Sequence, residues 1–234
     1  MKITTIQFAM TAALVCVTGL ATPLESQQTP QERARAMLPA DVYEGVSAVA
    51  REMVDAGVPA GPLFNKALEG LAKRVPPTQL VPAVRSYGMR LQQARSALGP
   101  GAGVPLLVAG ADAIQRGVPV DAIRSLPTDR PRSPVALLVL AELLESGIPQ
   151  DRAIRILRIS IDQRLQDARM LDIPVRVRRL IRDGVPPAEA IERIRRSLRR
   201  NRGGAITPIL PTGDQALADR RLRLRLDRWR RSGA

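Results

Sequence analysis

Apolar residues recur along this chain with the spacing of α-helices. Ahead of Gly57, for example, Val42, Val46, Val49 and Met53 fall at i, i+4, i+7 and i+11, which places them on one helix face. Only residues 221–226 alternate like a strand, and we favour a helix there because an isolated strand is unstable. The spacing predicts an all-α protein with helices starting at residue 30 and near 41–56, 61–73, 78–98, 105–116, 120–126, 134–146, 150–171, 175–183 and 187–200.

A three-residue sequence, glycine followed by valine or isoleucine and then proline, ends several of these helices. Glycine accepts the left-handed conformation that closes a helix at its C′ position, the next apolar side chain packs back on the helix, and proline cannot continue it. Each copy therefore predicts a turn between two helices, and Arg74-Val75-Pro76 is expected to do the same without a glycine. The copies are Gly57-Val58-Pro59, Gly117-Val118-Pro119, Gly147-Ile148-Pro149 and Gly184-Val185-Pro186.

The spacing of these turns leaves two architectures open. The copies begin 60, 30 and 37 residues apart, and two of the intervals are close to the length of a helical-hairpin repeat. An irregular helical bundle and a solenoid-like stack of helical hairpins both fit, in each case with a basic C-terminal tail. We divide the chain into a signal peptide (1–21), a linker (22–29), an N-terminal helical region (30–98), a Gly/Pro linker (99–103), a helical-hairpin region (104–202) and the tail (203–234).

The first residues are typical of a secretory signal peptide. Lys2 precedes an uncharged, mainly apolar run at 6–20 and a small-residue pattern that ends at Ala21, where we expect cleavage. The run is shorter than the roughly 20 residues needed to span a bilayer. An uncleaved membrane anchor and a lipoprotein modified at Cys16 are the alternatives. We therefore expect an exported protein, periplasmic or secreted.

The composition excludes several kinds of catalytic and metal site. The chain has no histidine, and its one cysteine, Cys16, is lost with the signal peptide, which excludes zinc sites built on these residues, thiol nucleophiles and imidazole triads. Glu142 and Glu145, like Glu189 and Glu192, form i, i+3 pairs of the carboxylates that glycoside hydrolysis uses. We interpret both pairs as solvated helix faces, the second paired with nearby arginines. We expect no cofactor, no metal and no enzymatic activity.

The excess of basic over acidic side chains is confined to the C-terminal part of the chain. Residues 22–151 carry 13 basic and 13 acidic side chains, whereas residues 152–234 carry 22 basic and 9 acidic ones. Such an asymmetry indicates an interaction surface or tail. The residues expected to bind an anionic partner are Arg193, Arg195, Arg196, Arg199, Arg200, Arg220, Arg221, Arg223, Arg225, Arg228, Trp229, Arg230 and Arg231.

These features predict an exported, non-enzymatic binding or structural protein of the cell envelope. Its partner is expected to be a membrane surface, an acidic or phosphorylated envelope polymer, or an acidic protein. Nucleic-acid binding through the same arginines is the first alternative, and an envelope enzyme that uses only carboxylates is the second. A tail that only solubilises the protein would also account for residues 203–234.

Overall fold

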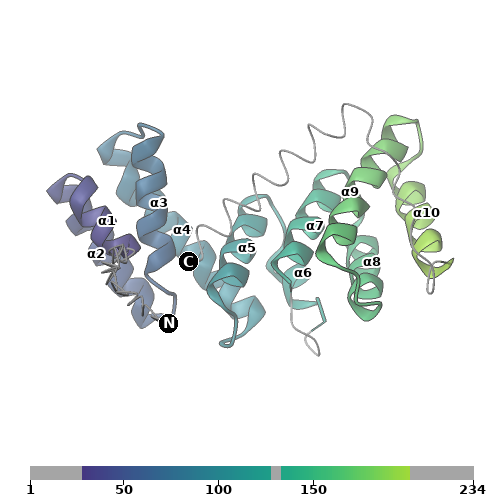
Figure 1. Cartoon of the computed structure of the whole chain (residues 1–234), viewed down its shortest axis with the longest axis horizontal. Helices are drawn as coiled ribbons and strands as arrows, with labels where there is room; N and C mark the ends of the chain where they lie inside the picture. The colour runs from purple at the N-terminus through teal and green to yellow at the C-terminus, as the bar shows by residue number, and fades with distance from the viewer. Residues whose placement is uncertain (1–27, 128–132, 201–234) are drawn as a thin grey trace, which may run out of the picture.

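The computed structural model describes residues 28–127 and 133–200. Within these ranges the chain forms ten α-helices and no strand, so the all-α prediction is confirmed for them. In Figure 1 the helices follow one another along the long axis of the molecule, with α1 and α2 at one end and α10 at the other. They are α1 (Pro30–Met37), α2 (Ala40–Asp55), α3 (Gly61–Ala72), α4 (Pro77–Leu98), α5 (Val104–Gln115), α6 (Val120–Arg124), α7 (Pro134–Glu145), α8 (Gln150–Asp162), α9 (Asp167–Arg182) and α10 (Pro187–Arg200).

Helices that lie two places apart in chain order pack side by side. This holds for α1 with α3, α2 with α4, α4 with α6, α5 with α7, α7 with α9 and α8 with α10. Consecutive helices also touch, as in the pairs α3 with α4, α7 with α8 and α9 with α10. Each helix thus buries its apolar stripe against several neighbours, which is how an amphipathic helix gains most of its stability.

The buried side chains form two hydrophobic cores that meet at α5. Leu107, Val108 and Ala111 belong to the N-terminal core, whereas Ala109 and Ala113 of the same helix belong to the C-terminal one. The close packing of α5 on α4 requires a glycine, because a Cβ on Gly110 would come within 2.7 Å of the Ala94 side chain. The segment 99–103 therefore interrupts the helices while side-chain packing continues across it.

Six turns close the preceding helix with the same pair of backbone hydrogen bonds. At the turn after α9, the amide of Gly184 donates to the Ile181 carbonyl at 3.0 Å, and the amide of Val185 donates to the Leu180 carbonyl at 3.0 Å. This is the Schellman arrangement, which satisfies carbonyls that have no partner within the helix. The residue at C′ has a positive φ each time: Gly57 (78°), Arg74 (58°), Gly117 (86°), Gly147 (75°), Arg164 (52°) and Gly184 (85°).

The turn at Arg164 contradicts the sequence prediction of one helix over 150–171 and another over 175–183. Instead, α8 ends at Asp162, and α9 runs continuously from Asp167 to Arg182 through Pro174. Without a glycine, the turn gives no signal in the sequence, although Leu165 is half-buried as the apolar C″ residue of the motif. The proline lacks one helix hydrogen bond, and burial of its ring offsets part of that loss.

Apart from that of α9, the predicted helix starts agree closely with the structure. At the start of α1, the Thr29 hydroxyl accepts from the Glu32 amide at 3.3 Å, and the Glu32 carboxylate accepts from the Thr29 amide at 2.7 Å. This reciprocal pair is the capping box that the sequence predicts. At the start of α7, the Ser133 hydroxyl accepts from the Val135 amide at 3.1 Å. Most of α7 is buried, as its nearly all-round apolar sequence leads us to expect.

Substitutions at Gly184 and Arg164 should change the stability in opposite directions. No atom lies within 4 Å of the Cβ position at Gly184, so Gly184→Ala should cost about 1 kcal/mol through backbone strain alone. Arg164→Gly should stabilise the protein by about 0.5 kcal/mol, because relief of strain exceeds the entropy that glycine adds to the unfolded chain. Chemical denaturation of both variants measures these differences, and stabilisation by Gly184→Ala would contradict the assigned turn.

Candidate functional site

Helix α10 lies at one end of the molecule and carries the densest positive charge of the described chain. It begins at Pro187 and has the acidic Glu189 in its first turn, where the positive end of the helix dipole stabilises a carboxylate. Its last turn holds Arg199 and Arg200 at the negative end of the dipole. The buried side is formed by Ala190, Ile191, Ile194 and Leu198, each no more than 3% exposed. The apolar face of the helix is therefore used entirely in the core.

Two of the five arginines on α10 are paired with glutamates of the same helix. Arg193 donates to Glu189 at 2.7 and 3.1 Å, and Arg195 donates to Glu192 at 2.6 Å. These are the pairs that the i, i+3 and i, i+4 spacing leads us to expect, and exposed pairs of this kind contribute only about 0.3–0.5 kcal/mol each. The glutamates thus neutralise part of the charge of the helix and contribute little to its stability.

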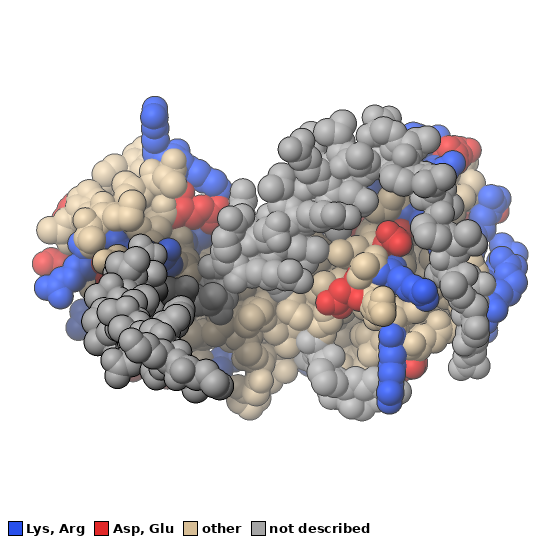
Figure 2. Space-filling view, in the orientation of Figure 1, with Lys and Arg blue, Asp and Glu red and all other residues tan. Residues whose placement is uncertain are grey.

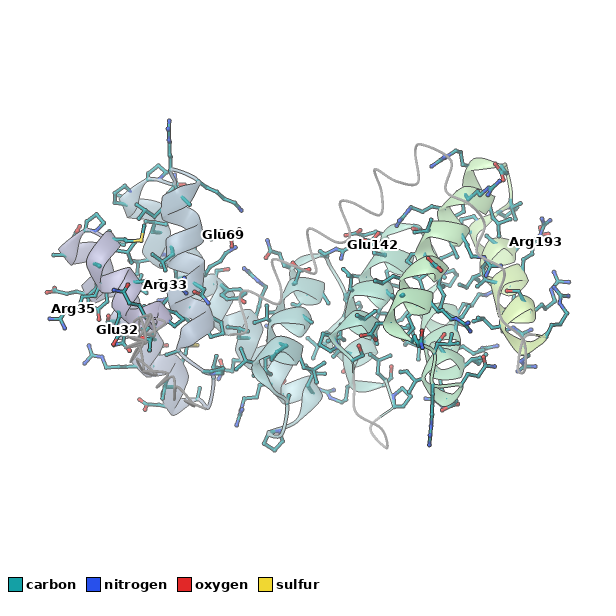
Figure 3. The ribbon with its side chains drawn as sticks, viewed as in Figure 1. Glu32, Arg33, Arg35, Glu69, Glu142 and Arg193 are labelled. Atoms are coloured by element: carbon teal, nitrogen blue, oxygen red, sulfur yellow. The ribbon has the colours of Figure 1, made fainter. Side chains whose placement is uncertain are left out.

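The other three arginines of the helix are exposed and unpaired. Arg196, Arg199 and Arg200 have no ion-pair partner within residues 28–127 and 133–200. Because they are three and four residues apart, they lie on one side of the last two turns. Figure 2 shows Lys and Arg side chains gathered at the end of the molecule that α10 occupies, and Figure 3 shows Arg193 pointing away from the other helices.

Two further arginines, on neighbouring helices, hold α10 in place. Arg152 of α8 donates to the Ala188 carbonyl at 2.8 Å, near the start of α10. Arg176 of α9 donates to the Ser197 hydroxyl at 3.4 Å, in its last turns. These contacts attach both ends of α10 to the helices beneath it, so its exposed arginines stand on a positioned helix.

Helices α8 and α9 carry arginines as well, but acidic residues are interspersed with them. On α8, Asp151, Arg155, Arg158 and Asp162 follow one exposed stripe, and Arg155 lies 3.6 Å from Asp151. On α9, the exposed charged residues are Asp167, Arg169, Asp172, Arg179 and Arg182. On α10, residues 193–200 hold five arginines and no acidic residue, and Glu192 lies one turn before Arg196.

Of the glutamate pair on α7, Glu145 is exposed but Glu142 is buried, which corrects the interpretation of the pair as a solvated face. Glu142 is 8% exposed and lies between Arg116, at the end of α5, and Arg178 of α9. Arg116 lies 3.0 Å from Glu142 and 2.6 Å from Glu145. Burial opposes the charge of Arg116, but the hydrogen bonds that it donates to Glu145 and the charges of both glutamates outweigh this effect and raise the pKa of Arg116.

This ion-pair network is structural. It joins the three helices α5, α7 and α9 through one buried carboxylate, and both Glu142 oxygens are engaged by arginines. The two arginines are 26 and 36 residues from Glu142 in the sequence, so spacing within one helix gives no sign of them. Both oxygens of this carboxylate thus make contacts that join helices.

A buried tyrosine lies near the middle of the N-terminal core. Tyr87 is 9% exposed, and the charged groups of Lys66 and Arg90 lie 5.7 and 6.0 Å from its ring centre. Burial, followed by the negative charges of Asp112 and Glu69, raises the pKa of the Tyr87 hydroxyl. The hydroxyl stays protonated at neutral pH, and its ring packs within the core, so we assign this cluster a structural role.

Part of the predicted site lies outside the described residues. This applies to Arg220, Arg221, Arg223, Arg225, Arg228, Trp229, Arg230 and Arg231. Across the described ranges, no cluster of three acidic side chains is arranged to hold a metal ion, and no helix is long and apolar enough to cross a membrane. Comparison of the chain with protein-family models, with curated proteins and with solved structures finds no match.

Loss of the buried carboxylate should destabilise the protein far more than loss of its exposed neighbour. Glu142→Ala leaves the buried Arg116 with less compensation and should cost about 3 kcal/mol. Glu145→Ala removes the same chemical group from a side chain that is 47% exposed and should cost less than about 1 kcal/mol. Urea denaturation of both variants provides the measurement, and equal losses would show that the charge at position 142 is as well solvated as that at 145.

Proposed function

We propose that this chain is an exported, non-enzymatic binding protein of the cell envelope that presents an arginine-rich end to an anionic partner. The observation that carries the proposal is a group of exposed arginines, Arg196, Arg199 and Arg200, that have no ion-pair partner in the described part of the chain and lie on the helix at one end of the array (Figure 1). Uncompensated positive charge attracts anionic surfaces and polymers at long range. The tail adds seven arginines against three aspartates in residues 203–234.

We further propose that the helices form a solenoid-like stack of hairpins, which is the architecture of many binding scaffolds. Several side-chain links between helices support it, because they join residues 32 to 36 positions apart in the sequence, whereas the links of Arg116 and of Arg176 to Ser197 span 21 to 29. Arg33 bonds to Asn65, Arg85 to Glu52, Ser133 to Asp167 and Arg178 to Glu142, at separations of 32, 33, 34 and 36 residues. A regular offset of this size is expected when each hairpin stacks on the one before it.

The signal-peptide pattern at the N-terminus supports export, and export distinguishes the proposed envelope protein from a nucleic-acid-binding protein. Lys2, the apolar run at 6–20 and the cleavage pattern at Ala21 support secretion. A nucleic-acid-binding protein could use the same arginines, since phosphate contacts need only positive charge. Recovery of the protein from the cytoplasm with its N-terminus intact would favour that alternative over ours.

Vesicle-binding measurements should reveal how residues 203–234 contribute to binding of an anionic surface. The processed protein should bind vesicles containing anionic lipid, and binding should weaken steeply with added salt because the attraction is screened. If residues 214–231 form an amphipathic helix on the surface, binding should raise the helical circular dichroism and shift Trp229 fluorescence to the blue.

Deletion of residues 203–234 is the matching variant. It should abolish the fluorescence shift and leave the helical core folded, since the buried stripe of α10 ends at Leu198. Undiminished vesicle binding by the truncated protein would assign the contact to α10, whereas no binding by either form would favour a tail that only solubilises the protein.

A further inference from the structure

We propose that the last turns of α10 bind the phosphate groups of an anionic lipid surface and that two glutamates of the same helix limit the strength of that binding. The binding residues are Arg196, Arg199 and Arg200, which we call the α10 patch. The limiting residues are Glu189 and Glu192. The inference rests on the proposed function and specifies the chemistry of its partner and how this part of the surface is controlled.

Phosphate is the ligand that best fits the chemistry of the patch. A guanidinium is planar and presents parallel N–H groups, so it can donate two hydrogen bonds to a phosphate at once. Residues three and four apart on a helix have Cβ atoms about 5–6 Å from each other. The patch therefore places three such groups within reach of one headgroup or of two adjacent ones.

The patch lies on the surface of a bilayer and does not insert. The apolar side chains of α10, including Ile191, Ile194 and Leu198, are no more than 3% exposed because they form the core. An interfacial helix needs an apolar face to bury among acyl chains, and α10 has none to spare. Its binding is then purely electrostatic and hydrogen-bonded, unlike that proposed for the tail.

The small extent of the patch favours a surface over a long polymer. A polymer chain is usually held by a track of cations along several elements. On α8, which packs beside α10, the exposed arginines share their stripe with Asp151 and Asp162, so the positive track does not continue there. The patch also belongs to the helix at one end of the described array of helices (Figure 1).

The two glutamates make two more arginines unavailable. Arg193 is paired with Glu189 at 2.7 Å and Arg195 with Glu192 at 2.6 Å. Both pairs are on the same helix as the patch, and Arg193 lies one turn from Arg196. Loss of the glutamate charges would therefore extend the patch from three arginines to five without any change in its scaffold.

The test is a Glu189→Gln/Glu192→Gln double variant of the processed full chain, residues 22–234. Vesicles of phosphatidylcholine with phosphatidylglycerol are compared with vesicles of phosphatidylcholine alone by co-sedimentation. Affinity for the anionic vesicles should rise roughly 25-fold, because each of the two freed cations near anionic lipid is worth about a fivefold increase. Binding to phosphatidylcholine alone should not change.

The chain offers a matched control for net charge. Asp121 of α6 pairs with Arg124 at 2.6 Å, and Glu52 of α2 pairs with Arg85 at 2.6 Å. The Asp121→Asn/Glu52→Gln variant therefore gains the same charge at exposed ion pairs on helices that do not pack beside α10. Its affinity should change less than about twofold if position, and not total charge, governs binding. An equal gain in both double variants would overturn the inference.

Conservative replacement tests the phosphate chemistry. A triple Arg196→Lys/Arg199→Lys/Arg200→Lys variant keeps the charge and loses the two-pronged hydrogen bonds, so its affinity should fall several-fold. The corresponding triple glutamine variant should fall by at least tenfold. Circular dichroism checks that α10 remains helical in each variant. An unchanged affinity of the lysine variant would show that the contact is a simple charge attraction.

The outcomes separate this inference from the proposed function. If the wild-type protein binds neither kind of vesicle, the proposed function itself fails. If it binds anionic vesicles but all variants on α10 bind equally well, the proposed function stands on the tail and the inference is wrong. Tighter binding to soluble polyphosphate than to vesicles would assign the patch to a phosphate polymer and overturn the choice of a lipid surface.

Discussion

The reversal of chain direction at the turns that end the helices is the constraint on which the rest of this structure depends. A helix with one apolar stripe gains stability only when that stripe is covered, and here the covering comes from the next helices along the chain. The C′ residue makes this possible because its left-handed conformation turns the backbone sharply while two hydrogen bonds close the helix behind it. Val58, Val118 and Ile148, the apolar residues that follow, are no more than 3% exposed and fix the turn to the core.

Most of the helical pattern could be predicted from the sequence because the relevant interactions are local. Apolar spacing, capping residues and the glycine-containing turns all act within a few residues of each other. The turn at Arg164 could not be predicted, since an arginine normally avoids a positive φ and only the completed hydrogen bonds and packing hold it there. The continuation of α9 through Pro174 could not be predicted either, because burial of the proline ring depends on helices far away in the sequence.

The candidate site divides in the same way. The pairing of Glu189 and Glu192 with arginines of their own helix follows from spacing, and the structure contains it. The burial of Glu142 does not follow, because its partners Arg116 and Arg178 come from helices on either side. The structural role of a charged residue on a helix therefore depends on its neighbours in space. The buried glutamate of α7 joins helices, whereas the glutamates of α10 neutralise part of the charge of an exposed surface.

The position of α5 also determines how the protein unfolds. Its residues belong to both hydrophobic cores, and Gly110 allows it to lie directly on α4. Opening of either core exposes apolar side chains that the other core needs, so the two halves share the cost of unfolding and lose their structure together. Only the outermost helices, with neighbours on one side, can detach without that cost. Helix α10 is one of them: Arg152 and Arg176 hold both of its ends, but its buried stripe can separate from α8 and α9 without uncovering α5.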